Sequence, residues 1–248
     1  MPIKLPFGLR NEKLIHISQL TETERGEKCN CICPNCKKPL SAKMGEIRQY
    51  HFAHQADSQC NISLALAIGL LQFAKEIIQA NNEILLPGWK ISQKDFANHE
   101  LSFLFSDDKY RTEQDPKLST YTFVSTKDRS SDVLNKIRNH PVIIRIFVSP
   151  LLNATTPTEH SRLPMFNLDL SFLSKVDLTS PQTKSIIEEQ ILHNEKNKTW
   201  LNNPKKESKL KEISEQLFED NKDYINRQKI YDNARKNIDK KKTHYTKR

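Results

Sequence analysis

The sequence predicts an α+β protein made of a small cysteine-rich module, a mixed sheet flanked by helices, and a helical tail. Three observations lead to this prediction. All five cysteines lie between residues 29 and 60, a long apolar helix and several short strands follow, and the last part of the chain repeats apolar residues every seven positions. We expect a module over residues 1–60, a larger domain over 61–204 and a tail over 205–248.

The cysteine cluster is typical of a metal site. Cys33 and Cys36 form a Cys-x2-Cys turn that points two thiolates at one ion, and His51, His54 and Cys60 follow within 24 residues. Zinc takes four nitrogen or sulfur ligands in a tetrahedral array, and this short spacing is its usual sequence form. We predict structural zinc bound by Cys33, Cys36 and His54, with either His51 or Cys60 as the fourth ligand.

Two further cysteines leave alternatives open. Cys29 and Cys31 lie just before the turn, where a strand would send both side chains to one face, but Cys-x-Cys is a poorer chelating spacing. A set of buried or redox cysteines is the alternative to a metal site. A secreted disulfide protein would spread its cysteines along the chain, and thiols that hold zinc fit the cytoplasm.

Composition favours a cytoplasmic protein that binds a polyanion. No apolar run approaches the roughly 20 residues that cross a bilayer, and the amino terminus does not look like a signal peptide. The net charge of +9 is concentrated at the two ends: residues 1–60 carry +3, residues 61–202 carry none, and residues 203–248 carry +6. This distribution favours DNA as a partner and argues against a membrane.

Periodicity places the elements in order along the chain. Short alternating runs within residues 2–32 predict a hairpin, and the apolar stretch 63–80, without proline, predicts a long buried helix. Residues 141–148 are apolar on both faces except for Arg145, which predicts a central strand. The other expected elements are a strand and turn at 83–89, strands within 99–125 (101–105 and 121–124), a short segment from 132, a polar loop at 150–163, an edge or terminating strand at 166–170, and a helix at 182–194 before a break at Pro204.

The seven-residue spacing of apolar residues in the tail predicts a helix with an apolar seam. A seam of this kind favours packing against another helix, so we expect either a protein partner or self-association through residues 210–238. A single amphipathic helix lying on the body of the protein is the alternative. Residues 240–248 are expected to be disordered and basic. The seam consists of Leu210, Leu217, Tyr224, Tyr231 and Ile238.

These motifs together resemble the competence protein CoiA-like family. In that family a zinc-ribbon-like unit with a His-Phe-Ala-His signature precedes a domain similar to PD-(D/E)xK nucleases. The resemblance implies a restriction-endonuclease-like mixed sheet and a role in DNA uptake, recombination, or antiviral and mobile-element defence. It covers residues 1 to about 205, through segments 31–36, 40–43, 51–54, 60, 74–78, 132–133, 167–171 and 198–204.

The chain departs from this family at positions that the resemblance makes catalytic. A Glu and a His are implied on the long helix, where Ala67 and Leu71 stand, and only Lys75 is retained. Asp132 stands at the position of a metal-binding acid, but Arg145 replaces the acid of the central strand. A guanidinium removes a ligand and repels Mg²⁺, so we predict a pseudo-nuclease in which Asp132 is vestigial.

The sequence is compatible with three functions. The first is a DNA-binding accessory protein without catalysis, in which Arg145 pairs with Asp132 or binds a phosphate. The second is an active Mg²⁺-dependent nuclease whose site is rebuilt from Glu76, Glu100 or Asp169. The third is a protein-interaction scaffold that uses the tail. The expected DNA-binding residues, besides Arg145, are Lys37, Lys38, Lys43, Lys240, Lys241 and Lys242.

Overall fold

The computed structural model describes residues 4–45, 49–55, 59–96, 102–126, 130–152 and 163–245. Helices and strands mix along the chain, so the predicted α+β class is confirmed. Contacts divide the protein into two compact units. The first contains Met1–Gly88 and Asp115–Asn203, and the second contains Trp89–Gln114 and Pro204–Arg248. The domain boundaries at residues 60 and 204 stay a prediction.

The amino-terminal module consists of two hairpins in the first unit. Strands β1 (Phe7–Arg10) and β2 (Lys13–His16) form the predicted hairpin. Asn11 and Glu12 both have positive φ at its turn, which is the backbone form that matches the twist of two antiparallel strands. The second hairpin joins β3 (Leu40–Lys43) to β4 (His51–His54), and the 3-10 turns η1 (Ile17–Gln19), η2 (Glu22–Glu24) and η3 (Glu27–Cys29) lie between the two.

Helix α1 (Ile62–Ala80) is the long apolar helix that the sequence predicts. The side chain of Asn61 caps it by accepting a hydrogen bond from the backbone N–H of Leu64 at 3.0 Å. Gly69 faces the ring of Phe7, and a Cβ at this position would lie 3.0 Å from that ring, so glycine permits the close approach of β1. The helix thereby joins the amino-terminal module to the rest of the unit.

The expectation that no apolar run is long enough to cross a bilayer is wrong for α1. Among the described helices, α1 alone has the length and composition for a membrane span. Its buried residues, however, belong to the same core cluster as the sheet, so the helix serves as a core element. This packing supports a soluble protein, and the cytoplasmic location stays a prediction.

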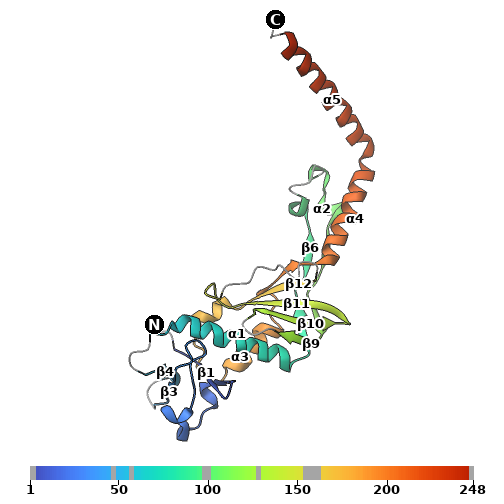
Figure 1. Ribbon diagram of the computed structural model, residues 1–248. Coiled ribbons are helices and arrows are strands. Elements are labelled where there is room, and N and C mark those ends of the chain that lie inside the picture. The colour runs from blue at the N-terminus through green and yellow to red at the C-terminus, as the bar shows by residue number, and fades with distance from the viewer. Residues whose placement is uncertain are drawn as a thin grey trace. The chain divides into compact units, whose positions relative to one another are not determined.

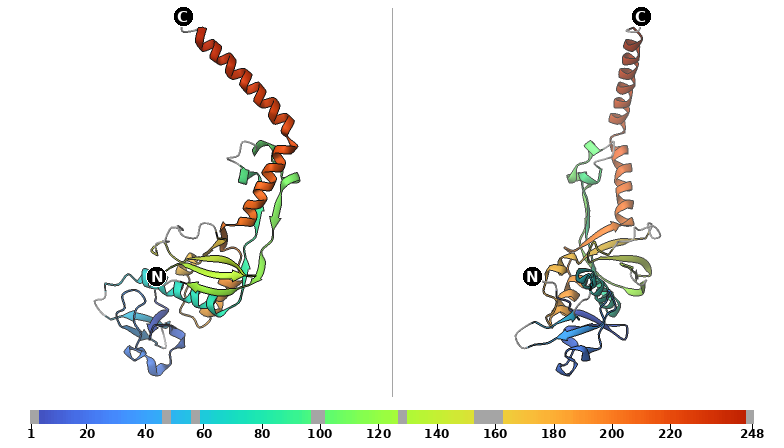
Figure 2. Two further views of the ribbon diagram at one scale, coloured as in Figure 1. Left: turned by 45° about the vertical axis from the view of Figure 1, so that its right-hand side comes forward. Right: turned by 60° about the vertical axis from the view of Figure 1, so that its left-hand side comes forward.

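A mixed five-stranded sheet forms the body of the first unit (Figures 1 and 2). Strands β9 to β11 form an antiparallel meander, β12 runs parallel to β11, and β13 runs antiparallel to β12. Helix α1 and helix α3 (Thr183–Leu192) contact each other and cover one face of this sheet. The strands are β9 (Thr122–Thr126), β10 (Asp132–Ile137), β11 (His140–Phe147), β12 (Met165–Asp169) and β13 (Lys198–Asn202).

The prediction of a central strand around Arg145 is confirmed, but two neighbouring expectations are wrong. Strand β12 lies between β11 and β13, so it is not at the edge of the sheet. Residues Ser102–Leu104 form the 3-10 turn η5 where a strand was expected. The first unit also contains the turn η6 (Ser171–Lys175) and a separate strand pair, β5 (Glu83–Leu86) with β8 (Lys117–Thr120).

The second unit packs the tail against an insertion between β5 and β8. Strands β6 (Trp89–Ile91) and β7 (Thr112–Gln114) pair, and the turns η4 (Gln93–Phe96) and η5 and the short helix α2 (Asp107–Tyr110) lie between them. Helix α4 (Pro204–Asp220) completes a small core, and α5 (Lys222–Tyr245) follows. The core residues are Ile91, Phe96, Phe105, Tyr110, Ile213 and Leu217.

The tail differs from its prediction at its end. Helix α5 continues to Tyr245, so the disorder expected from residue 240 is not found over residues 240–245. Residues 246–248 lie outside the described residues.

His16 joins the amino-terminal module to the segment that follows η6. Its Nε2 lies 2.7 Å from the backbone carbonyl of Leu178, which only accepts, so Nε2 carries the proton and donates. Its Nδ1 accepts from the backbone N–H of Ser18 at 3.2 Å. Burial lowers the pKa of His16, although the Leu178 carbonyl opposes this effect. The folded protein therefore holds His16 as a neutral ring.

This contact predicts a pH-dependent stability. The folded pKa lies below the unfolded value of about 6.5, so the contribution of His16 is complete above that pH and is lost as the pH falls toward the folded pKa. We expect the parent protein to be more stable than His16→Gln at pH 7 and this difference to shrink toward pH 5. Denaturant unfolding of both proteins at each pH measures this difference in stability. The pH dependence that the zinc ligands cause is the same in both proteins, so it cancels from the difference. A difference that stays constant with pH would contradict the assignment.

Candidate functional site

Four predicted metal ligands converge at one point of the amino-terminal module. The ligand atoms of Cys33, Cys36, His54 and Cys60 all lie within 4.8 Å of one another. Cys33 Sγ lies 3.7 Å from Cys60 Sγ, and Cys36 Sγ lies 3.3 Å from His54 Nε2. With Zn–S near 2.3 Å and Zn–N near 2.0 Å, tetrahedral geometry requires about 3.8 Å between two sulfurs and about 3.5 Å between sulfur and nitrogen. The cluster therefore fits zinc.

Local backbone hydrogen bonds build the turn that carries two of these ligands. The N–H of Lys37 donates to the carbonyl of Cys33 at 3.1 Å, and the N–H of Cys33 donates to the carbonyl of Lys38 at 2.8 Å. Lys37 has φ of 61°, the left-handed conformation that reverses the chain after the second cysteine. Asn35 donates from Nδ2 to Cys60 Sγ at 3.6 Å, which holds the distant ligand toward the turn.

The titration of the ligands suits metal binding. Burial raises the pKa of Cys33 to about 12, so this thiol would not ionise readily without a cation. Burial also disfavours the thiolate of Cys36, but hydrogen bonds from the backbone of Lys38 and from Cys60 and Cys33 outweigh it and lower the pKa. Burial, and then the charge of Lys38, lower the pKa of His54 and favour the neutral ring that binds metal.

The remaining candidates lie outside the cluster. His51 is on β4 three residues before His54, and alternation along a strand sends the two rings to opposite faces. Its Nδ1 donates to the carbonyl of Gln49 at 2.9 Å. Cys29 and Cys31 are buried in the core cluster, where their thiols donate to the carbonyls of Leu40 and Cys29. Burial raises the pKa of Cys31 to about 12.

Asp132 and Arg145 form a bidentate ion pair on the sheet. They are directly opposed on β10 and β11, and Arg145 donates from Nε and Nη2 to the two oxygens of Asp132, both at 2.7 Å. Only 10% of the Arg145 side chain and 17% of the Asp132 side chain are exposed. The hydrogen bonds to Asp132 raise the pKa of Arg145, and the pair has no net charge.

This ion pair lies on the sheet face opposite α1. Ile144 and Ile146, on either side of Arg145, belong to the core cluster that includes α1, so Arg145 points the other way. Its neighbour on β12 is Asn167, which is neutral. No second carboxylate lies opposite Arg145 in the register of the described strands.

The other acids proposed for a rebuilt nuclease site are not grouped with Asp132. Among the described residues, no cluster of potential metal ligands contains Asp132 and another of these acids. Asp169 ends β12 and accepts a hydrogen bond from the backbone N–H of Ser171 at 2.9 Å. Glu76 lies on α1 and accepts from Gln72 at 3.3 Å, and Lys75 is beside it on the same helix. Glu100 lies outside the described residues.

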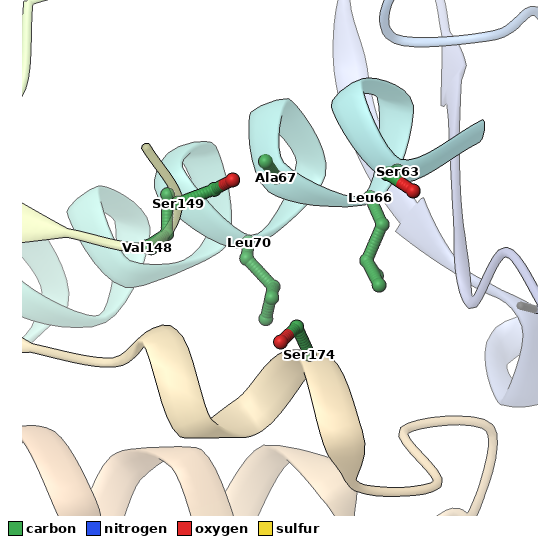
Figure 3. A pocket seen from close by; sticks show the side chains of 7 residues that line it. All are labelled: Ser63, Leu66, Ala67, Leu70, Val148, Ser149 and Ser174. Carbon is green, nitrogen blue, oxygen red and sulfur yellow. The ribbon is translucent and has the colours of Figure 1, made fainter. Parts of the chain in front are cut away.

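A pocket of about 180 Å³ lies between α1, the end of β11 and η6 (Figure 3). It includes Ala67, where the resemblance implies a catalytic acid. The other lining residues are aliphatic or serine, so the seven residues that line the pocket supply no carboxylate for a metal. They are Ser63, Leu66, Ala67, Leu70, Val148, Ser149 and Ser174.

The predicted DNA-binding residues have different surroundings. Lys37, Lys38 and Lys43 are exposed on the amino-terminal module, close in sequence to the metal ligands. Arg145 is buried against Asp132. Residues 240–242 belong to α5, and their side chains lie outside the described residues. Asn35 and Lys38 also influence the metal cluster, which was not predicted from the sequence, although both lie in or beside the Cys-x2-Cys turn.

Comparison with known proteins finds a match in the amino-terminal module. Residues 14–63 match the family model described as the competence protein CoiA, N-terminal domain. The matched range contains all four residues of the metal cluster, so it supports a CoiA-like, metal-binding protein. No curated protein and no solved structure matches the chain.

Proposed function

We propose that this chain is a zinc-containing DNA-binding protein of the CoiA-like nuclease superfamily that has lost catalysis and acts as an accessory subunit. Zinc has a structural role in this proposal, because four protein ligands leave no open position for a substrate. The setting implied by the resemblance is DNA uptake, recombination, or defence against phage and mobile elements. The expected location is the cytoplasm.

The Asp132–Arg145 pair is the observation that carries this proposal. A metal-dependent nuclease holds Mg²⁺ between carboxylates, and the ion activates water and stabilises the charge on the phosphate. Here both oxygens of Asp132 accept hydrogen bonds from a guanidinium. A cation would have to displace Arg145 and would then meet its positive charge, so the pair disfavours a Mg²⁺ site.

Charge supports nucleic acid as the ligand. The exposed lysines of the amino-terminal module belong to an end of the chain with net charge +3, and the tail carries +6. Contacts between such residues and phosphates release counterions, which makes the binding weaken steeply with salt.

The experiment that tests the proposal combines binding and cleavage. Labelled linear, nicked and single-stranded DNA are incubated with the zinc-loaded protein and Mg²⁺ or Mn²⁺, and Asp132→Ala is run beside the parent. We expect salt-sensitive binding of DNA, with affinity falling by about tenfold or more between low and physiological salt. We expect no cleavage by either protein.

Each other outcome points to a different function. Cleavage that is lost in Asp132→Ala would overturn the loss of catalysis and establish an active nuclease. A protein that neither binds nor cleaves DNA would contradict the DNA-binding role and favour a protein-interaction scaffold.

A further inference from the structure

Helix α5 presents a stripe in which one cation lies between two aromatic rings. Tyr224 and Tyr231 are seven residues apart, which is close to two helical turns and places both rings on one face about 10.5 Å apart along the axis. Arg227 lies between them on the same face, one turn after Tyr224. We call these three residues the tyrosine stripe.

The tyrosine stripe is exposed along its length. Tyr224 is 43% exposed and Tyr231 is 66% exposed, and all described side chains from Asn226 to Arg235 are exposed. The ring of Phe103 of η5, itself 60% exposed, lies beside that of Tyr224 in a tilted arrangement with ring centroids 6.1 Å apart. Exposed apolar side chains that lie together and are bordered by polar residues mark interaction sites.

The apolar seam predicted for the tail therefore has two different parts. In α4, Leu217 is buried in the small core of the second unit, and Leu210 packs against that core. In α5, Tyr224 and Tyr231, which continue the repeat, face solvent. The part before residue 220 is used for packing within the chain, and the part after it is available for a ligand.

The residues between the tyrosines argue against a helix as that ligand. A coiled-coil seam needs apolar residues at both positions of each heptad. With Tyr224 and Tyr231 at the first position, the second is occupied by Arg227, Ala234 and Lys241. Pairing two copies of α5 in parallel would bring Arg227 against Arg227 and Lys241 against Lys241. Helix α5 has eight basic and three acidic residues, which adds to the repulsion.

We propose that the tyrosine stripe binds single-stranded nucleic acid, with bases stacked on Tyr224 and Tyr231 and a phosphate held by Arg227. This inference rests on the proposed function and names the form of nucleic acid that α5 takes. A single strand alternates planar bases with phosphates, which matches two rings with a cation between them. Paired bases in a duplex are stacked on each other and do not offer their faces to tyrosine.

The test measures binding by the full-length protein to fluorescent oligothymidylate, oligouridylate and a duplex of equal length. Changing Tyr224→Ala together with Tyr231→Ala is expected to weaken binding to single strands by about tenfold or more, because stacking on each ring is lost. Duplex binding and the salt dependence should stay the same, since no charge changes. Comparing oligothymidylate with oligouridylate shows whether DNA or RNA is preferred.

Two matched variants separate stacking from folding. Tyr224→Phe with Tyr231→Phe keeps both rings and should bind single strands like the parent. Ile230→Ala removes an apolar side chain that is 71% exposed but lies off the stripe, and it should also bind normally. Circular dichroism confirms that α5 remains helical in each variant.

The outcomes distinguish this inference from the proposed function. A parent protein that binds no nucleic acid overturns the proposed function and this inference with it. If the parent binds nucleic acid and the double alanine variant binds single strands equally well, the role of the tyrosine stripe is overturned and the proposed function stands. An equal loss of affinity for duplex and for single strands would overturn stacking of bases on the tyrosines. Self-association in analytical ultracentrifugation that the alanine changes abolish would identify a protein interface in its place.

Discussion

Replacing His54 with alanine is expected to release zinc from the protein, whereas replacing His51 with alanine leaves it bound. His54 Nε2 lies 3.3 Å from Cys36 Sγ inside the four-residue cluster, and His51 lies on the other face of β4. Structural zinc contributes roughly 10–16 kcal/mol to the folding of small zinc modules, so the loss of one ligand should also lower the melting temperature. Metal analysis after gel filtration and thermal unfolding measure both effects.

The two histidines are matched controls because they lie three residues apart on one strand. Zinc content should be about one ion per chain in the parent and in His51→Ala and close to zero in His54→Ala. Cys31→Ala tests the competing Cys-x-Cys pair and should keep its zinc. If His51→Ala loses zinc while His54→Ala keeps it, the ligand set is wrong, and a protein that never contains zinc would exclude the metal site.

The metal cluster was largely predictable because its spacing is local. A Cys-x2-Cys turn fixes two ligands almost independently of the rest of the fold, and the nearby histidines and Cys60 limit the others. The sequence left His51 and Cys60 as alternatives. Choosing between His51 and Cys60 as the fourth ligand requires knowing that residues 51–54 form a strand. Alternation along a strand then separates His51 from His54.

The sheet was predictable where its strands are apolar and was missed where they are polar. Strand β11 is buried on both faces, and its run of isoleucine and valine marks it clearly. Strand β13 begins with Lys198, which is buried and donates from Nζ to the carbonyl of Leu192 at the end of α3. Burial lowers the pKa of Lys198 to about 8. A lysine with this role looks like a surface residue in the sequence.

The missed strand also explains the wrong position of β12. Residues 166–170 include the polar Asn167 and Asp169, and polar residues are common where a sheet meets water. In the structure β13 covers that side of β12. A pairing between segments about 30 residues apart is decided by tertiary packing, which local composition does not reveal.

Removing one member of the Asp132–Arg145 pair is expected to destabilise the fold by about 3 kcal/mol, near the lower end of the range for buried pairs because both side chains keep some exposure. Arg145→Met leaves the Asp132 carboxylate without its partner on a largely buried face. Asp132→Asn leaves the guanidinium of Arg145 without its charged partner on the same face. Denaturant unfolding at neutral pH and low salt measures the free energy of unfolding of each variant.

The double change, Arg145→Met with Asp132→Asn, distinguishes a structural ion pair from two independent side chains. If the pair replaces a lost metal site and now serves to neutralise Asp132, the double variant should be more stable than the sum of the single effects predicts, because neither charge is left alone. Additive effects would mean that the two side chains do not depend on each other. Arg145 would then be free to bind a phosphate, and the argument that Arg145 blocks a cation at Asp132 would lose its support.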